Sequence, residues 1–325
     1  MLVSVVVPFY NEEESLKPFY DAITQVIDSV ERYEFELVFS NDGSKDQSVE
    51  ILQKIMINDS RVKIVDLSRN YGKETALLAG LDHAEGDAVI MMDSDLQHPP
   101  YLIPEFLKWW EQGYDDIYAT RQERVGEPWL KKKTSELYYK ILQGVTEQGV
   151  EIYPNAGDFR LLDRKVVDAL IQLREQSRYM KGMYGWVGFR KKEIFFDAAE
   201  RVGGTTKFNF KKLMKLAIDG VTSFTTAPLT FAAYIGSVFA LFGFVYGIII
   251  LIQTIFLGKD VPGFPSIMTA VLFLGGLQLI TLGIAGTYIG KIFYESKNRP
   301  LYFVEDFLTA ESMKKRSEGE NDDIR

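Results

Sequence analysis

The amino-acid sequence predicts an α/β protein, in which an open, mostly parallel β-sheet domain precedes two membrane-spanning helices. Three observations support this prediction. Short apolar, β-branched runs alternate with segments of helical periodicity over residues 1 to about 200. Polar clusters follow directly after several of these runs. Two long segments in the second half of the chain carry no charged residue.

Four apolar runs predict strands, at residues 2–9 (LVSVVVPF), 35–40 (FELVFS), 62–68 (VKIVDLS) and 87–92 (DAVIMM). Continuous runs of this kind are typical of strands buried on both faces of a parallel sheet. Helical patterns lie between them, over Glu13–Val30, Gln47–Ile57 and Lys73–Ala84. Ser44 and Gln47 have the spacing of a capping box for the second helix. The alternation predicts βαβ units with helices on both faces of the sheet.

Polar residues gather where three of these strands end. Tyr10-Asn11-Glu12 follows the first, Asn41-Asp42-Gly43 the second and Asp93-Ser94-Asp95 the fourth. Because open α/β sheets bind ligands at the carboxyl ends of their strands, we expect a ligand site at this edge. The chain has neither GxxxxGK[ST] nor GxGxxG, which excludes the usual phosphate loops.

The two uncharged segments run from Gly220 to Gly258 and from Val261 to Gly290. Each exceeds the roughly 20 residues needed to cross a hydrocarbon core, and we place the spans at Leu229–Leu257 and Ser266–Ile289. The alternative, two buried helices of a soluble core, fits less well because a polar stripe is missing. Basic residues lie outside the pair, whereas the turn between the spans has only one (Lys207, Lys211, Lys212, Lys215, Lys291, Lys297 and Arg299 outside; Lys259 in the turn). The positive-inside rule therefore predicts that both large flanks are cytoplasmic.

Composition excludes several classes of function. The 325-residue chain has a net charge of −8, which argues against nucleic-acid binding. It has no cysteine, hence no disulfide framework and no thiolate metal site. Two histidines, His83 and His98, cannot build a zinc centre alone, and we expect both to be structural. The charged end, residues 313–325, is expected to be disordered, and no cleavable signal peptide is expected at the start of the chain.

The stretch VIMMDSDLQHPP sets two carboxylates, Asp93 and Asp95, directly after a predicted buried strand. Neighbouring carboxylates repel each other unless a positive group lies between them. A hard divalent cation such as Mg²⁺ or Mn²⁺ fits, because it takes oxygen ligands and is often completed by substrate phosphates. The alternative is a pair of solvated aspartates that cap the following turn.

Six motifs occur in the order seen in family-two glycosyltransferases of the GT-A fold, a Rossmann-like fold: VVVPFYNEE, SNDGSKD, NYGKETALLAG, MMDSDLQHPP, NAGDFRLLDR and RYMKGMYGWVGF. Over roughly residues 1 to 210 the chain resembles the polyprenyl-phosphate branch of that family, and is similar to dolichol-phosphate mannose synthase and the bacterial bactoprenol glucosyltransferases. The two predicted spans resemble the bactoprenol type.

The resemblance implies roles for individual residues. The nucleotide-sugar site would comprise Pro8, Tyr10, Glu12, Asp42, Lys73, Asp93 and Gln97. Asp42 would hydrogen-bond uracil, and Asn41 departs from the acidic residue usual at the position before it. Asp95 would be the direct metal ligand, with Asp93 beside it and nearer the sugar or ribose. Asp158 would lie near the acceptor, where a carboxylate is proposed as base.

Basic residues are assigned to the acceptor phosphate. They are Arg121, Arg124, Arg201 and Lys207. For Arg121 and Arg124, closure over the diphosphate is weighed against a solvated loop. Lys207–Gly220 mixes lysine with apolar residues, which indicates an interfacial helix rather than a solvated charge run. Trp129–Leu142 is basic and aromatic, and is either a headgroup contact or an ordinary surface helix.

These assignments predict four parts: a cytoplasmic GT-A catalytic domain (1–206), a juxtamembrane amphipathic helix (207–225), a two-helix transmembrane hairpin (226–293) and a cytoplasmic C-terminal tail (294–325). The expected reaction is inverting, metal-dependent transfer of a hexose, glucose in first place, from a UDP-sugar to undecaprenyl phosphate at the bacterial inner membrane. A phosphate ester is largely anionic near pH 7, so Asp158 is expected to orient the acceptor more than to deprotonate it.

Other functions stay open at this point. UDP-N-acetylglucosamine is the alternative donor. A processive polysaccharide synthase is a further alternative, although QSRYM at residues 176–180 resembles its QxxRW motif only faintly and two spans cannot build a pore. A non-catalytic membrane scaffold is the third. The resemblance also implies a homo-tetramer.

Overall fold

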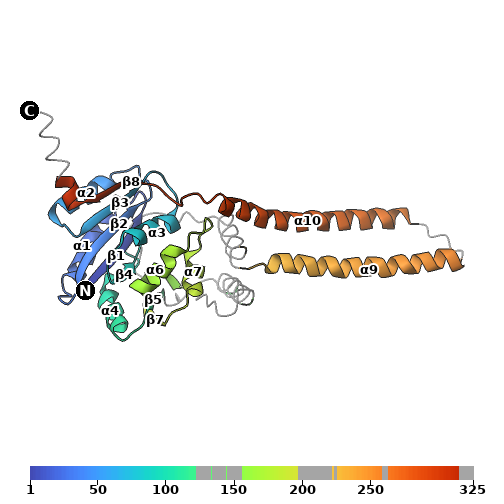
Figure 1. Ribbon diagram of the computed structural model, residues 1–325, viewed down its shortest axis with the longest axis horizontal. Coiled ribbons are helices and arrows are strands. Elements are labelled where there is room, and N and C mark those ends of the chain that lie inside the picture. The colour runs from blue at the N-terminus through green and yellow to red at the C-terminus, as the bar shows by residue number, and fades with distance from the viewer. Residues whose placement is uncertain are drawn as a thin grey trace, which may run out of the picture. The chain divides into compact units, whose positions relative to one another are not determined.

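The protein is described by a computed structural model that covers residues 1–121, 133, 144, 156–196, 222, 225–257 and 263–314 (Figure 1). The chain forms two compact units. The α/β unit comprises Met1–Gly144, Gln148–Leu213 and Pro300–Arg325, and the hairpin unit comprises Val145–Glu147 and Met214–Arg299.

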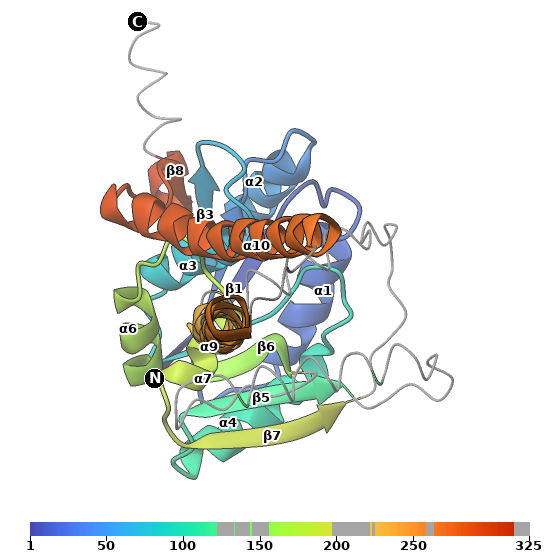
Figure 2. The same cartoon turned by 90° about the vertical axis from the view of Figure 1, so that its right-hand side faces the viewer.

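The α/β unit contains an eight-stranded sheet in the order β7-β5-β6-β4-β1-β2-β3-β8. The strands are β1 Leu2–Phe9, β2 Glu34–Asn41, β3 Val62–Leu67, β4 Ala88–Met91, β5 Asp116–Arg121, β6 Ala156–Asp163, β7 Lys191–Phe196 and β8 Val304–Thr309. Strand β1 pairs in parallel with β2 and β4, as do β2 with β3 and β5 with β7. Only β6 and β8 run antiparallel to their neighbours. Figure 2 shows β6, β5 and β7 side by side at one end of the sheet. The predicted mostly parallel α/β sheet is confirmed.

Helices cover both faces of this sheet. They are α1 Leu16–Ile27, α2 Ser48–Asn58, α3 Lys73–His83, α4 Ile103–Glu111, α6 Arg164–Gln172 and α7 Met180–Trp186. On one face, alternate residues of β1 (Val3, Val5, Val7 and Phe9) join a buried cluster with apolar residues of α1, α2 and α4. On the other face, α3 packs against β1 so closely that a Cβ on Gly80 would lie 2.4 Å from Val6 Cγ1. Because side chains alternate between the two faces along a strand, successive residues pack against two separate helix layers.

The predicted capping box is wrong. Helix α2 begins at Ser48, whose backbone N–H donates to Asp46 Oδ1 at 3.1 Å. Ser44 Oγ instead accepts from the Asn11 N–H at 2.9 Å, which ties the loop after β2 to the loop after β1. Ser44 therefore makes a contact between the loops at two strand ends and does not cap the helix.

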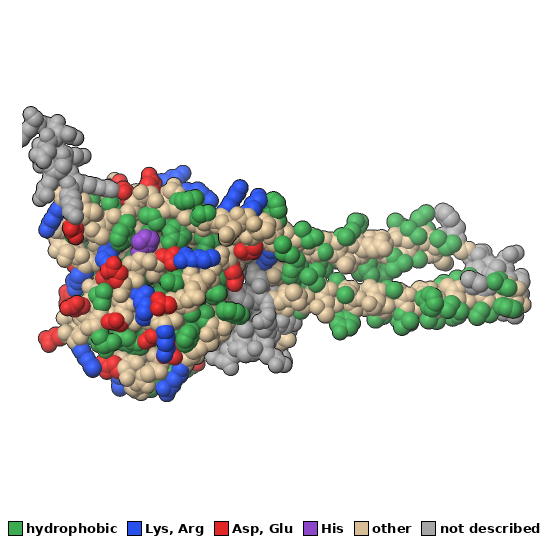
Figure 3. All heavy atoms as spheres, viewed as in Figure 1, with side chains coloured by type: hydrophobic (Ala, Val, Ile, Leu, Met, Phe, Trp, Pro, Cys, Tyr) green, Lys and Arg blue, Asp and Glu red, His purple; other side chains and the backbone are tan. Residues whose placement is uncertain are grey.

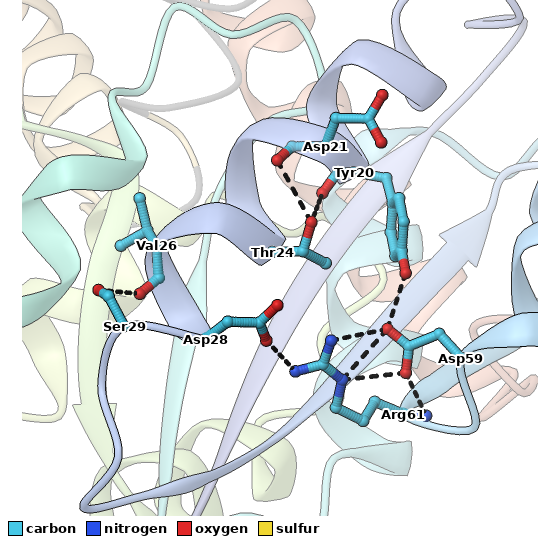
Figure 4. A network of polar contacts seen from close by, with 8 residues as sticks. All are labelled: Tyr20, Asp21, Thr24, Val26, Asp28, Ser29, Asp59 and Arg61. Atoms are coloured by element: carbon cyan, nitrogen blue, oxygen red, sulfur yellow. Dashed lines mark hydrogen bonds and ion pairs between the residues drawn. The ribbon is translucent and has the colours of Figure 1, made fainter.

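A polar network joins α1 to the turn before β3 (Figure 4). Tyr20 Oη donates to Asp59 Oδ2 at 2.8 Å, and Arg61 binds the same carboxylate through Nε and Nη2 at 2.9 to 3.1 Å. Arg61 also reaches Asp28 at 2.6 Å. Burial, followed by the Asp59 carboxylate, raises the pKa of Tyr20 to about 12. Because Arg61 directly precedes β3, this network lies at the amino-terminal edge of the parallel strands, away from the predicted ligand edge.

The hairpin unit contains two long helices, α9 Ala227–Leu257 and α10 Phe264–Ser296. They match the predicted spans, although α10 continues past Ile289 to Ser296. Both are long and apolar enough to cross a membrane, over Ala227–Ile250 and Ser266–Ser296. Figure 3 shows apolar and uncharged side chains along most of their visible length, in contrast to the charged surface of the α/β unit. The predicted helix at 207–225 lies almost entirely outside the described residues.

The segment after α10, which was predicted as a C-terminal tail, contains regular secondary structure. Within the predicted tail, residues 304–309 form β8, the edge strand that pairs with β3, and residues 310–314 are helical. Met313 and Lys314, expected to be disordered, belong to that helical turn, and residues 315–325 lie outside the described residues. Strand β8 has a half-exposed pattern and two acidic residues, which is typical of an edge strand that avoids further pairing.

A buried ion pair links β5 to β6. Arg160 Nη1 contacts both Asp116 carboxylate oxygens at 3.0 and 3.2 Å, and Nη2 donates to the Gly157 carbonyl at 3.0 Å. Both side chains are almost fully buried, and the Arg160 guanidinium lies 3.5 Å from the centre of the Tyr184 ring. The pair therefore holds the antiparallel part of the sheet in register beside Asp158.

Replacing Arg160 alone should destabilise the α/β unit by roughly 3–5 kcal/mol, because Asp116 is left buried without its counter-ion. The double variant Arg160→Met/Asp116→Leu should recover most of that loss, since it leaves no unpaired charge. Urea unfolding of the detergent-solubilised protein measures both values. A double variant that is less stable than Arg160→Met would show that an unpaired Asp116 charge is not the cause of the loss.

Candidate active site

The ammonium of Lys73 lies between two carboxylates at the carboxyl-end edge of the sheet. Its Nζ is 2.7 Å from Asp93 Oδ1 and 2.9 Å from Oδ2, and 2.9 Å from Asp158 Oδ2. Asp93 follows β4, Asp158 lies on β6, and Lys73 is the first residue of α3. The structure thus brings together three residues that were assigned to donor and acceptor roles from the sequence.

Strand register explains why the two aspartates meet. Strands β4 and β6 are antiparallel neighbours with Met91 opposite Arg160. Continuing this register by two residues along each strand sets Asp93 opposite Asp158. Like charges directly opposite each other in an antiparallel pair are destabilising, so the site needs a cation at this position. Lys73 supplies it.

The loop before α3 is held by Asp42 at the end of β2. Its carboxylate accepts from the Tyr71 N–H at 2.6 Å and from the Gly72 N–H at 2.9 and 3.1 Å. Gly43 has φ +67°, and a Cβ there would lie 2.5 Å from the Arg69 carbonyl carbon. The glycine therefore allows the close approach of the two loops. The hydrogen bonds described for the Asp42 carboxylate go to this backbone, and burial raises its pKa.

Lys73 also decides the charge of Asp158. Burial acts to raise the pKa of Asp158, but the Lys73 ammonium, with Arg160 and Lys181, outweighs burial and holds that pKa below its usual range. Conversely, burial acts to lower the pKa of Lys73, and Asp93 and Asp158 raise it overall. At neutral pH the site therefore holds an ionised Asp158 that is a weak base.

The turn after β4 is fixed by His98. The Asp93 backbone N–H donates to His98 Nδ1 at 3.0 Å, which assigns the ring proton to Nε2. The ring stacks on Phe159 with 5.0 Å between centroids. Burial lowers the pKa of His98 despite the nearby Asp93, so the ring is neutral at pH 7. His98 is thus packed as a structural residue, and it positions the carboxylate pair.

Asp95 lies in the same turn, where its Oδ1 accepts from the Gln97 N–H at 3.1 Å and Leu96 has φ +59°. Among the described residues, no three histidine, aspartate or glutamate side chains gather as a metal site. Asp93 and Asp95 both offer carboxylate oxygens from this one turn. Such a donor set fits a divalent ion that takes its other ligands from a diphosphate and from water.

The first-strand loop lies at the same edge. Pro8 is in register with Ser40 of β2, and Tyr10 is exposed. The Glu12 N–H donates to Ser48 Oγ at 2.9 Å, and the Glu12 carboxylate accepts from Ser15 Oγ at 2.7 Å. The Ser48 contact ties the loop after β1 to the start of α2.

Of the basic residues assigned to the acceptor phosphate, the described residues include only Arg121. Arg121 ends β5, and its Nη2 is buried without a hydrogen-bond partner among the described residues. No described contact joins Arg121 to the Lys73 cluster. Arg124, Arg201 and Lys207 lie outside the described residues, as does the segment Trp129–Leu142 except for Lys133.

Glu74, which follows Lys73 on α3, was not predicted as a site residue. Its Oε2 accepts from the Met180 N–H at the start of α7, at 3.0 Å. Burial, followed by the charge of Asp158, raises the pKa of Glu74 to about 7. A glutamate in the first turn of a helix is usually explained by the helix dipole, so no sequence signal distinguished it.

Comparison with known proteins identifies the family. The family model described as glycosyl transferase family 2 matches residues 4–171, more than half of the chain. The chain belongs to glycosyl transferase family 2. It is therefore an enzyme of the glycosyltransferase class, its α/β unit has the GT-A fold, and the predicted resemblance is confirmed.

Relatives of this family 2 protein match it over nearly its whole length. It is 47% identical over 304 residues to an uncharacterized glycosyltransferase of Synechocystis sp., which covers 94% of this chain and 95% of the relative. It is 44% identical over 306 residues to the bactoprenol glucosyl transferase of Shigella phage SfV, with 94% and 99% covered. Among solved structures, it is similar to glucosyl-3-phosphoglycerate synthase from Mycobacterium tuberculosis, with a TM-score of 0.44, 17% identity, and 68% and 77% covered.

Replacing Lys73 by methionine should lower the melting temperature at pH 7, because Asp158 then lies beside Asp93 without its ion-pair partner. The depressed pKa of Asp158 contributes stability above its ordinary value of 3.8, which is lost as pH falls through the folded pKa. The difference between wild type and variant should therefore be full at pH 7 and shrink below about pH 4. Thermal unfolding across this pH range measures it.

Lys17→Met is the matched control, because Lys17 forms an exposed pair with Asp21 one turn along α1. Exposed pairs of this kind contribute about 0–1 kcal/mol, so its melting temperature should change little at any pH. A Lys73→Met profile that ran parallel to wild type from pH 7 to pH 3 would argue against Lys73 as the counter-ion of Asp158.

Proposed function

We propose that the protein transfers a hexose, with glucose as the first choice, from a UDP-sugar to undecaprenyl phosphate at the cytoplasmic face of the bacterial inner membrane. The observation that carries the proposal is the Lys73 bridge between Asp93 and Asp158. The bridge joins Asp93, in the turn expected to face the diphosphate, to Asp158, which is expected to face the acceptor. The 44% identity to a phage bactoprenol glucosyl transferase, which extends through both apolar helices, supports this donor sugar and this acceptor.

The reaction is a single displacement. An oxygen of the lipid phosphate forms a bond to C1 of the sugar, the bond from C1 to the diphosphate oxygen breaks, and its electron pair leaves with UDP. Configuration at C1 is inverted, because the oxygen enters opposite the leaving group. Mg²⁺ or Mn²⁺ held by Asp95 and Asp93 would supply Lewis-acid stabilisation of the departing diphosphate. Pro8, Tyr10, Glu12, Asp42 and Gln97 would surround the nucleotide.

Asp158 is proposed to orient the acceptor. Its pKa lies below the usual range, so it binds a proton poorly near pH 7. The acceptor phosphate is itself largely anionic there and needs little help from a base. If Asp158→Asn lost activity only at low pH, where the phosphate is protonated, a base role would be favoured instead.

The membrane part of the proposal rests on sequence. Helices α9 and α10 would span the bilayer with both flanks in the cytoplasm, and residues 207–225 would lie at the interface. Arg201 and Lys207 would then contact the lipid phosphate, together with Arg121 and Arg124. A homo-tetramer is proposed from the resemblance.

A second donor, UDP-N-acetylglucosamine, is compatible with the same uridine-binding residues and differs only in the sugar pocket. A polysaccharide synthase or a non-catalytic scaffold is less consistent with two apolar helices and a clustered Lys73, Asp93 and Asp158. Failure to bind any nucleotide sugar in the presence of Mg²⁺ would favour the scaffold.

The decisive assay mixes detergent-solubilised protein with undecaprenyl phosphate, Mg²⁺ and a panel of UDP-sugars, and identifies the lipid product by mass. We expect one hexose added, from UDP-glucose in first place. Asp95→Asn should lower turnover at least about 100-fold, because part of the charge stabilisation at the diphosphate is lost.

Asp21→Asn, on the exposed side of α1, is the matched control and should keep wild-type turnover. Equal turnover of Asp95→Asn and wild type would contradict the assigned metal role. Absence of any lipid-linked sugar across the panel would contradict the proposed reaction.

A further inference from the structure

The C-terminal segment 302–309 contacts both ends of the stretch that carries Lys73. That stretch, residues 68–83, comprises the loop after β3 and helix α3. The contacts come from residues that follow α10 in the chain but belong to the α/β unit. They are independent of the residues already assigned to donor or acceptor.

The first contact is at the start of the stretch. Strand β8 runs antiparallel to β3, and the Ser68 N–H donates to the Phe303 carbonyl at 3.0 Å. Ser68 lies three residues before Tyr71, whose N–H is held by Asp42. The loop that leads to Lys73 is therefore fixed by the segment that leads into β8 on one side and by Asp42 on the other.

The second contact is at the end of α3. Tyr302 Oη donates to Asp82 Oδ2 at 2.5 Å, and Arg174 binds the same carboxylate through two bonds of 2.7 and 2.8 Å. The Asp82 side chain is only 13% exposed. Next to it, the rings of His83 and Phe307 lie against each other with their centroids 5.0 Å apart.

We infer that Tyr302 is a positioning residue for the active site. Through Asp82 it fixes the far end of α3, while Phe303 fixes the loop at its near end, so that Lys73 stays between Asp93 and Asp158. Without the Tyr302 hydroxyl, the Asp82 carboxylate keeps Arg174 but loses its second described side-chain partner. The end of α3 is then less firmly held, and a shift of about 1 Å in a catalytic group is costly to the rate. The inference deepens the proposed function, and it relies on that function for the identity of the donor.

The molecule supplies a matched control for this inference. Tyr20 donates to Asp59, and Asp59 is held by Arg61, in the network of Figure 4. The chemistry is the same as that of Tyr302, Asp82 and Arg174: a tyrosine hydroxyl on a carboxylate that is bound by arginine. However, the Tyr20 network lies at the amino-terminal edge of the strands, and none of its described contacts involves α3.

The experiment compares Tyr302→Phe with Tyr20→Phe. Each variant loses one hydrogen bond to a charged group, so both should lose a similar amount of thermal stability. Only Tyr302→Phe should lower kcat for glucosyl transfer, by about fivefold or more, because Lys73 is then less firmly held between Asp93 and Asp158. Only Tyr302→Phe should increase deuterium uptake in residues 69–74. Asp82→Asn added to Tyr302→Phe should cause less than the sum of the two single effects.

Equal kcat values and equal uptake in residues 69–74 for the two tyrosine variants would overturn the inference, because Tyr302 would then add stability only. A wild-type protein that neither binds UDP nor uses UDP-glucose would contradict the proposed function. In that case, hydrogen exchange of residues 69–74 would still decide the inference, since it needs no substrate.

Discussion

The candidate active site depends on one cation between two carboxylates. Register sets Asp93 and Asp158 opposite each other, and burial would drive Asp158 to bind a proton if no positive charge were near. The Lys73 ammonium, within 2.9 Å of both side chains, keeps Asp158 ionised. The surrounding contacts hold Lys73 in this position. Asp42 fixes the loop before α3, Glu74 fixes the start of α7, and the segment around β8 fixes residues 68–83.

The sheet topology makes this arrangement possible. In a wholly parallel sheet only the carboxyl ends of strands meet at the ligand edge. Strand β6 is antiparallel, so Asp158, near its start, reaches that edge beside the end of β4. The buried Arg160–Asp116 pair holds β6 to β5 behind it. The reversed strand β6 thus brings Asp158, which is proposed to face the acceptor, to an edge that the loops after the parallel strands also form.

Much of the fold was predictable because strands that are buried in a parallel sheet consist of continuous apolar runs. The first four strands and the two apolar helices have such runs, and the three helices between the strands have helical periodicity. Strand β8 does not: VEDFLT is short, half-exposed and acidic. The pairing of Tyr302 with Asp82 joins residues 220 positions apart, and Glu74 owes its raised pKa to burial and to Asp158 on another strand. Such features arise only when distant segments meet, so local patterns cannot predict them.

A double-mutant cycle on Lys73 and Asp158 tests the central interaction most directly. The free energy of unfolding would be measured at pH 7 for wild type, Lys73→Met, Asp158→Asn and the double variant. We predict that Lys73→Met costs clearly less stability when Asp158 is already asparagine, with an interaction energy of roughly 0.5–3 kcal/mol. Single effects that add to within about 0.3 kcal/mol would show that the two residues are not coupled and would contradict the central role of the Lys73 bridge.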